Sequence, residues 1–251
     1  MSKIGKPEKM IIDGKRLDGR GLEEFRPLTA EVGALKRANG SAVFKFGDTY
    51  ALSGVFGPKT MHPRHLQDPQ RAFLKCRYSM APFSTKERIR PGRSRRGTEI
   101  SKVLKEALSN VIFFEDYPKT GIDVFVVILQ ANASTRCAGL NAASLALAEA
   151  GVSMRNLISS CTVGKVDGQI VLDVGGDEDQ FGDVDVAFAT IGNKDKIVLF
   201  QMDGIVTKEE FLKMIDLAKK GCAQIFEKQV NALREKYKTG EENVENEWKL
   251  C

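Results

Sequence analysis

The chain of 251 residues has little of what zinc proteins, disulfide-rich proteins and membrane proteins need. It has two histidines, both within residues 62–65, and five scattered cysteines without a C-x-x-C pair. Zinc sites and disulfide frameworks need clustered ligands or paired thiols, so neither is expected, and the unpaired cysteines favour a reducing cytoplasm. No apolar run approaches the roughly 20 residues of a membrane-spanning helix. The first ten residues do not resemble a signal peptide. We therefore expect a cytoplasmic protein without a membrane partner.

The sequence also lacks a Walker A pattern and a G-x-G-x-x-G motif, so the two commonest nucleotide-cradling loops are not supported. What it does have is segregated charge on a mildly basic chain of net charge +5. Residues 86–96 (KERIRPGRSRR) hold six basic residues and one acidic residue, whereas residues 173–185 hold six acidic residues and no basic one. A solvated surface does not require such separation, and the basic run permits a polyanionic partner.

The residue pattern predicts an α+β fold with two similar αβ halves, in which mixed or antiparallel sheets pack on helices. Asn39-Gly40 and Gly47-Asp48 separate β-like runs, which is typical of hairpins. Helical spacing of apolar residues marks three further segments. Strands are expected at residues 28–35, 41–46, 49–56, 73–80, 124–129, 160–165, 169–173, 184–190 and 197–201. Helices are expected at residues 99–113, at 137–150 and from Thr207, whose hydroxyl can form a capping box with Glu210.

The two halves show no repeat at the residue level, so one compact unit over residues 25–238 is expected. Residues 1–24 are polar, with a turn at Asp18-Gly19, and are predicted to be an N-terminal extension. Residues 57–71 contain too many prolines and polar groups for a regular element and are expected to form a surface loop. Residues 239–251 are expected to be a charged, frayed C-terminal tail.

The segment Ser134-Thr135-Arg136 joins a buried strand to an Ala-rich helix. Free N–H groups at a helix start attract a phosphate, the two hydroxyls add donors, and Arg136 adds a forked guanidinium. A plain helix cap with Arg136 in solvent explains the same residues. Arg95 and Arg96 precede another helix, where basic residues oppose the helix dipole, so they are candidate phosphodiester contacts as well as possible loop residues.

The acidic segment 177–185 contains the two candidate catalytic carboxylates, Asp179 and Asp185. Clustered carboxylates raise one another's pKa and suit Mg²⁺, so a general acid or a Mg²⁺ site are both candidates. In a continuous strand the two would lie roughly 20 Å apart. Gly175-Gly176 and Gly182 are therefore expected to fold or bulge the chain. An acidic turn explains Asp177 and Glu178 but not Asp185, which begins an apolar strand.

Several motifs together resemble the RNase PH family, and within it the catalytic subunit of the archaeal exosome. They are KRLDGR, HPRHLQDPQRA, RYSMAPFST, SRRGTEISKVLKEAL, NAASLALAEAG and EDQFGDVDV, in that order over residues 10–235. The resemblance implies a phosphorolytic 3′→5′ exoribonuclease, in which inorganic phosphate is the co-substrate and nucleoside diphosphates are released. It also implies a six-subunit ring in which the chain alternates with a related non-catalytic subunit beneath S1/KH-type RNA-binding caps.

The resemblance also assigns roles to single residues. Arg95 and Arg96 match the pair that grips RNA near the scissile phosphate, and Arg64 matches a loop position facing the RNA channel. Ser134, Thr135 and Arg136 match the phosphate-binding loop. Asp179 and Asp185 match the paired catalytic carboxylates, with Asp185 the general acid or metal-linked residue.

The family's phosphate loop has an Asp-x-Gly pattern before a serine or threonine and an arginine, but this chain has Asn132-Ala133-Ser134 before Thr135 and Arg136. Loss of the glycine restricts close backbone approach to phosphate, so the activity could be altered. Two alternatives therefore stay open: a non-catalytic RNA-binding ring subunit, and a homohexameric RNase PH that trims tRNA ends.

Overall fold

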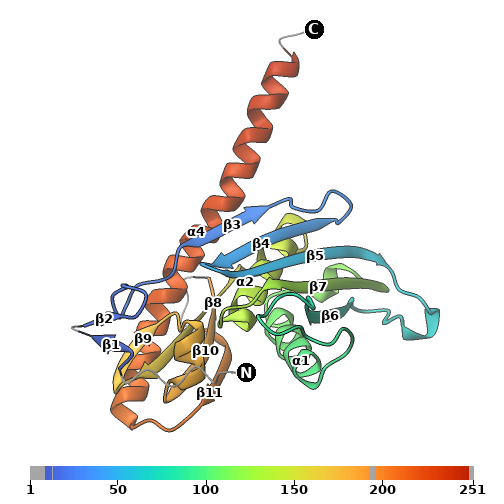
Figure 1. The fold of residues 1–251 in the computed structure, drawn as a ribbon. Helices are drawn as coiled ribbons and strands as arrows, with labels where there is room; N and C mark the ends of the chain where they lie inside the picture. The colour runs from blue at the N-terminus through green and yellow to red at the C-terminus, as the bar shows by residue number, and fades with distance from the viewer. Residues whose placement is uncertain (1–8, 13, 193–195, 249–251) are drawn as a thin grey trace.

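The computed structural model describes residues 9–12, 14–192 and 196–248, with the backbone alone described for residues 239–248. It contains a five-stranded sheet of order β3-β4-β5-β7-β6 and a four-stranded sheet of order β11-β10-β8-β9. The smaller sheet is antiparallel, and the larger sheet has one parallel pair, β6–β7. The expected α+β fold with two sheet-and-helix halves is therefore confirmed (Figure 1).

The larger sheet is formed by β3 (Leu28–Val32), β4 (Gly40–Phe46), β5 (Thr49–Thr60), β6 (Phe73–Met80) and β7 (Thr120–Gln130). The smaller sheet is formed by β8 (Ile158–Val166), β9 (Gln169–Leu172), β10 (Val184–Ile191) and β11 (Ile197–Asp203). The helices are α1 (Arg95–Ser109), α2 (Thr135–Glu149), α3 (Gly176–Phe181) and α4 (Lys208–Trp248). Two 3₁₀ turns are η1 (Arg64–Leu66) and η2 (Phe114–Asp116). The strand and helix predictions are confirmed within a few residues, whereas the two short strands before residue 17 and α3 were not foreseen. The predicted loop 57–71 is wrong at residues 57–60, because β5 continues through them, and η1 lies within the rest.

Helix α2 is the centre of the molecule because it contacts strands of both sheets. Twelve of its fifteen residues are buried, so it has no polar face. Its alanines let the flanking backbones approach closely. A Cβ added at Gly40 of β4 would lie 2.2 Å from the Ala146 carbonyl oxygen of α2, so no larger residue fits at Gly40. The N-terminus of α2 is thereby fixed at the junction of the two sheets.

The N-terminal segment is built into the second half of the molecule. Strands β1 (Ile11–Ile12) and β2 (Lys15–Arg16) form a small hairpin, and the Ile11 N–H donates to Asp167 Oδ2 at 3.1 Å. The Arg16 guanidinium is buried and binds the Glu178 carboxylate and the Leu172 carbonyl oxygen. The described part of the predicted extension is therefore a structural element of this half.

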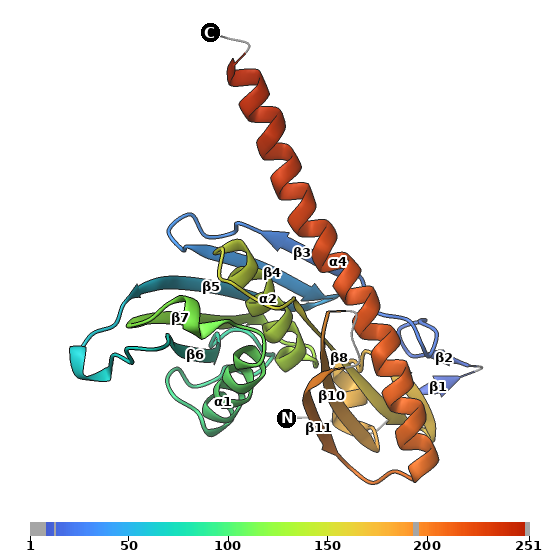
Figure 2. The same cartoon turned by 180° about the vertical axis from the view of Figure 1, so that it is seen from behind.

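Helix α4 packs on β8 and β3, and its last turns project beyond the sheets (Figures 1 and 2). The predicted capping box is present, since the Glu210 N–H donates to Thr207 Oγ1 at 3.3 Å and Thr207 N–H donates to Glu210 Oε2 at 2.9 Å. The helix continues to Trp248, so most of the predicted tail has a helical backbone. Within the described residues, no helix is both long and apolar enough to cross a bilayer.

Candidate active site

The two candidate carboxylates are brought together by helix α3. The Gly175 N–H donates to Glu178 Oε2 at 2.6 Å, which starts this helix, and Gly182 ends it just before β10. A helical turn advances far less per residue than a strand, so Asp179 on α3 and Asp185 on β10 meet at one cavity of about 210 Å³. The glycines thus permit a fold in the chain, as expected, but as a helix rather than a bulge.

Both carboxyl groups are electrostatically perturbed. Burial, and then the negative charge of Asp179, raise the pKa of Asp185 from 3.8 to about 6, against the opposing influence of Arg136. Desolvation of its carboxyl group also raises the pKa of Asp179, although Arg96, Arg136 and Arg26 act in the opposite direction. Asp185 Oδ1 is buried and has no hydrogen-bond partner among the described residues. Asp185 is therefore suited to hold a proton near neutral pH.

Two arginines reach these carboxylates from two different helices. Arg96 lies in the first turn of α1 and Arg136 in the first turn of α2, and both line a cavity of about 370 Å³ together with Asp185. This convergence joins the basic and acidic segments that are remote in sequence. It places cationic groups where a phosphate and a phosphodiester could meet Asp185.

Three further polar residues line this cavity that the sequence alone did not indicate: Glu99, Gln201 and Asp203. Glu99 Oε1 accepts from Gln201 Nε2 at 3.2 Å and from Arg136 Nη2 at 3.4 Å, so it ties α1 to α2 and β11. Asp203 is the cross-strand partner of Asp185, and its charge contributes to the raised pKa of Asp185. The pairing of β10 with β11 would have revealed Asp203, but a strand register cannot be read from these residues alone.

The predicted phosphate loop differs from the expectation at Ser134 and Thr135. Ser134 is the N-cap of α2, but its hydroxyl does not cap the helix. Ser134 Oγ lies instead 2.7 Å from Thr162 Oγ1 and donates to the Val174 carbonyl oxygen at 3.1 Å. Thr135 is also buried. The Ser134 hydroxyl is thus bonded within the protein, and the role of Ser134, Thr135 and Arg136 in phosphate binding stays a prediction.

The loop keeps a left-handed backbone without glycine. Ala133 has a φ of 57° and Ser134 a φ of 55°. This conformation costs non-glycine residues roughly 1–2 kcal/mol each. It persists only where surrounding contacts enforce it. The loop thus adopts a conformation that favours glycine, and the contacts that hold it must offset the cost.

Two of the predicted RNA contacts lie outside this centre. Arg95 starts α1 beside Arg96 but lines none of the cavities described above. Arg64 lies in η1, in the loop between β5 and β6, at the end of the larger sheet that is far from β10 and β11 (Figures 1 and 2). The structure therefore brings Arg96, and neither Arg64 nor Arg95, to the candidate carboxylates.

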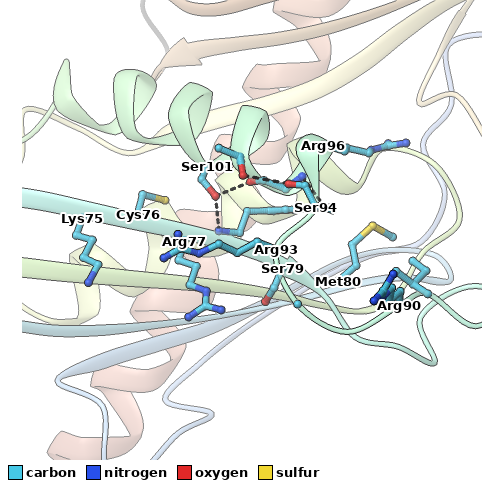
Figure 3. Close-up of a pocket in the computed structure, with 15 residues that line it drawn as sticks. Lys75, Cys76, Arg77, Ser79, Met80, Arg90, Arg93, Ser94, Arg96 and Ser101 are labelled. Atoms are coloured by element: carbon cyan, nitrogen blue, oxygen red, sulfur yellow. Dashed lines mark hydrogen bonds between the residues drawn. The ribbon is translucent and has the colours of Figure 1, made fainter.

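A basic groove continues from Arg96 along the edge strand β6. This groove encloses about 240 Å³, and Figure 3 shows its side chains beside the start of α1. Its cationic residues are Lys75, Arg77, Arg90, Arg93 and Arg96. No carboxylate lines the groove, and none of the five pairs with an acidic residue in the described part of the chain. Unpaired like charges in one groove favour a polyanionic ligand.

The described residues contain no cluster of three or more acidic, histidine or cysteine side chains able to hold a metal ion. Asp179 and Asp185, which line one cavity, are the predicted pair of carboxylate ligands. Mg²⁺ is often bound by one or two carboxylates together with substrate phosphates, so this pair fits a Mg²⁺ ion that the substrate helps to hold.

The chain is similar to known proteins over nearly all of its length. It is 51% identical over 237 residues to exosome complex component Rrp41 of Thermococcus kodakarensis, covering 93% of this chain and 95% of that protein. It is 52% identical over 241 residues to exosome complex component Rrp41 of Archaeoglobus fulgidus, covering 94% and 93%. The crystal structure of rice (Oryza sativa) Rrp46 shares the fold, with a TM-score of 0.79 at 22% identity, over 87% of this chain and all of that one.

Family models match both halves of the chain. The model of domain 1 of the 3′ exoribonuclease family matches residues 24–153, and the model of domain 2 matches residues 156–221. The boundary falls between α2 and β8, so each model covers one sheet. The chain therefore belongs to the 3′ exoribonuclease family of RNase PH.

Proposed function

We propose that the chain is the catalytic subunit of an exosome ring and degrades RNA by phosphorolysis from the 3′ end. The observation that carries this proposal is the convergence of Arg96, Arg136, Asp179 and Asp185 on adjoining cavities at the start of α2. Hydrolysis needs an activated water, whereas this site offers two guanidinium groups and free helix N–H groups to a second anion. Inorganic phosphate is accordingly the proposed co-substrate.

In the proposed reaction, phosphate lies against the first N–H groups of α2 and Arg136, while Arg96 holds the terminal phosphodiester. A phosphate oxygen attacks the phosphorus, the bond to the 3′-oxygen of the preceding nucleotide breaks, and Asp185 donates a proton to that oxygen. The products are a nucleoside diphosphate and an RNA shorter by one nucleotide. The reverse reaction adds a nucleotide to the RNA. Mg²⁺, if held by Asp179 and Asp185, would supply neutralising charge at the phosphates.

The RNA strand is proposed to follow the basic groove on β6 to Arg96. Relatives named as exosome components support assembly with related subunits, and we extend to this chain the ring with a non-catalytic partner and S1/KH-type caps. The described cysteines are all free thiols, which supports a reducing cytoplasmic location.

The test is the phosphate dependence of RNA degradation by the chain with and without the related ring subunit. We expect nucleoside diphosphates only when phosphate is supplied, and little activity without the partner. Release of nucleoside monophosphates in phosphate-free buffer would instead indicate a hydrolase. RNA binding without turnover in the assembled ring would favour the non-catalytic alternative. If the purified protein has the mass of a homohexamer and is fully active without a second subunit, a tRNA-trimming RNase PH is favoured.

A further inference from the structure

A buried arginine from the N-terminal part of the chain holds the loop before α2. Arg26 precedes β3, and its Nη1 donates to the Asn132 carbonyl oxygen at 2.5 Å. Its Nη2 donates to Ser134 Oγ at 3.1 Å. The two contacts lie on either side of Ala133. One guanidinium thus grips both ends of the left-handed part of the loop.

The same guanidinium is anchored to the second half of the molecule. Arg26 Nε and Nη2 donate to the two oxygens of Asp173 at 2.8 and 2.6 Å, and the Arg26 N–H donates to Asp173 Oδ2 at 2.9 Å. The side chains of Arg26 and Asp173 are 8% and 1% exposed, so solvent screens this pair little. Arg20 Nη1 also donates to Asp173 Oδ2, at 3.2 Å. The anchor is therefore rigid and its charge is paired.

Other contacts hold the two sides of the loop separately. Thr49 Oγ1 donates to the carbonyl oxygens of Asn132 and Ala133 at 2.8 Å each, and accepts from the Asn132 N–H at 3.0 Å. Ser134 Oγ contacts Thr162 Oγ1 and the Val174 carbonyl oxygen. Among the described residues, Arg26 alone bonds both the loop backbone and the Ser134 side chain. Without this link, Ala133 could relax to a negative φ, which would reorient the N–H groups at the start of α2.

We infer that Arg26 is a positioning residue that holds Ala133 and Ser134 in the left-handed conformation needed to present the α2 N–H groups to phosphate. This inference rests on the proposed function and deepens it. It explains how a loop without glycine at 133 or 134 adopts a left-handed conformation at both positions. Because Arg26 touches the loop and not the phosphate, it acts through the backbone.

The test compares Arg26→Lys with Arg26→Lys/Ala133→Gly in the full chain, assembled with its related subunit. Lysine keeps the charge beside Asp173 but cannot reach both sides of the loop. We expect Arg26→Lys to raise the KM for inorganic phosphate about tenfold, or about 1.4 kcal/mol, with a smaller change in kcat. Glycine adopts a positive φ without steric cost, so Ala133→Gly should restore the phosphate KM to within about twofold of wild type.

Arg16→Lys is the matched control, because Arg16 is a buried arginine bound to Glu178 and to carbonyl oxygens but does not touch the loop. It should lower the thermal unfolding midpoint and leave the phosphate KM unchanged, with no effect of Ala133→Gly. Three outcomes would each overturn the inference. The phosphate KM could be unchanged in Arg26→Lys, Ala133→Gly could fail to relieve its defect, or Arg16→Lys could show an equal defect.

A second measurement does not depend on turnover. Phosphate should raise the thermal unfolding midpoint of the wild type and of the double variant more than that of Arg26→Lys, since binding to the folded state alone stabilises it. Equal shifts in all three proteins would also overturn the inference. Absence of phosphate-dependent cleavage by the wild type would overturn the proposed function itself, so the two failures are distinguishable.

Discussion

At the scale of single residues, the acidic segment divides into two roles. Asp179 and Asp185 face the cavities next to Arg136, whereas Glu178 is buried in an ion pair with Arg16. Asp177 is exposed and lines neither cavity. The chemistry is therefore concentrated in two of these carboxylates, and Asp185 is the more perturbed of the two.

Replacement of Asp185 by asparagine should abolish phosphorolysis while RNA binding persists. Asparagine cannot donate the proton to the leaving oxygen, so kcat should fall by at least about 100-fold. The RNA dissociation constant, measured by filter binding, should change by about twofold or less. Asp177→Asn is the matched control and should keep wild-type kcat. An equal loss of turnover and RNA binding would assign Asp185 a structural role.

The raised pKa of Asp185 also predicts a pH-dependent stability. Because its pKa is about 6 in the folded chain and 3.8 ordinarily, the folded state binds its proton more tightly. The tighter proton binding stabilises the folded state fully below pH 3.8, and this stabilisation is lost as the pH rises from 3.8 through 6. Asp185→Asn has no carboxylate to ionise, so at pH 8 its free energy of unfolding should exceed that of the wild type by on the order of 2 kcal/mol, and it should unfold at a higher temperature. Calorimetry at pH 5 should show roughly half of this difference, and at pH 3 almost none of it should remain. Equal differences at pH 3 and pH 8 would contradict the assignment.

At the scale of elements, the site depends on how α3 contacts the loop before α2. A Cβ added at Gly176, the first residue of α3, would lie 2.2 Å from Asn132 Oδ1. The acidic helix and the phosphate loop are therefore packed against each other without space for a methyl group. The position of Asp179 relative to Arg136 follows from this contact.

Gly176→Ala should displace the end of the Asn132 side chain, and because that side chain can move, the cost should be about 1 kcal/mol. In the Asn132→Ala background the clash is removed, so most of this cost should disappear. Denaturant unfolding of the four proteins gives the coupling free energy directly. If the cost of Gly176→Ala is the same in both backgrounds, the contact does not set the position of α3.

At the scale of the whole molecule, the basic groove on β6 and the acidic cavities share Arg96. The groove is lined by residues of β6, an edge strand of the larger sheet, and Asp185 lies near the start of β10 in the smaller sheet. Figure 1 shows where β6 and β10 lie in the two sheets. A single RNA strand in the groove would thus reach the carboxylates with its 3′ end. The basic and acidic segments of the sequence thus lie on adjoining parts of the surface, with Arg96 between them.

Reversal of the charges of Lys75 and Arg77 should weaken the binding of long RNA more than the binding of short RNA. Lys75→Glu/Arg77→Glu should raise the KM of RNAs that extend into the groove at least about tenfold and reduce the salt dependence of binding. It should leave kcat on the shortest substrates unchanged. Lys213→Glu/Lys220→Glu, on exposed positions of α4, makes the same kind of charge change away from the groove. A length-independent defect, or an equal defect in this control, would exclude the groove from the RNA path.

The sequence by itself determined the order of strands and helices, because their apolar periodicity and turn residues are local signals. It also marked Arg96, Arg136, Asp179 and Asp185 as candidate site residues, because they are charged residues at helix starts and beside an apolar strand, although plain structural roles stayed open for the arginines. The motifs of the family extended this reading to phosphate and RNA. These features depend on residues that are near one another in the chain.

Only the tertiary structure decided which of these residues meet and which do not. In the structure the Ser134 hydroxyl is buried, Arg64 lies away from the cavities around Asp185, and Glu99, Gln201 and Asp203 line one of those cavities. It also paired Arg26 with Asp173 across 147 positions of sequence. Local propensity contains no information about such contacts, because they form only when the two sheets close on α2. The residue types thus indicated the chemistry of the candidate site, whereas the packing of the two sheets on α2 determined the arrangement of its residues.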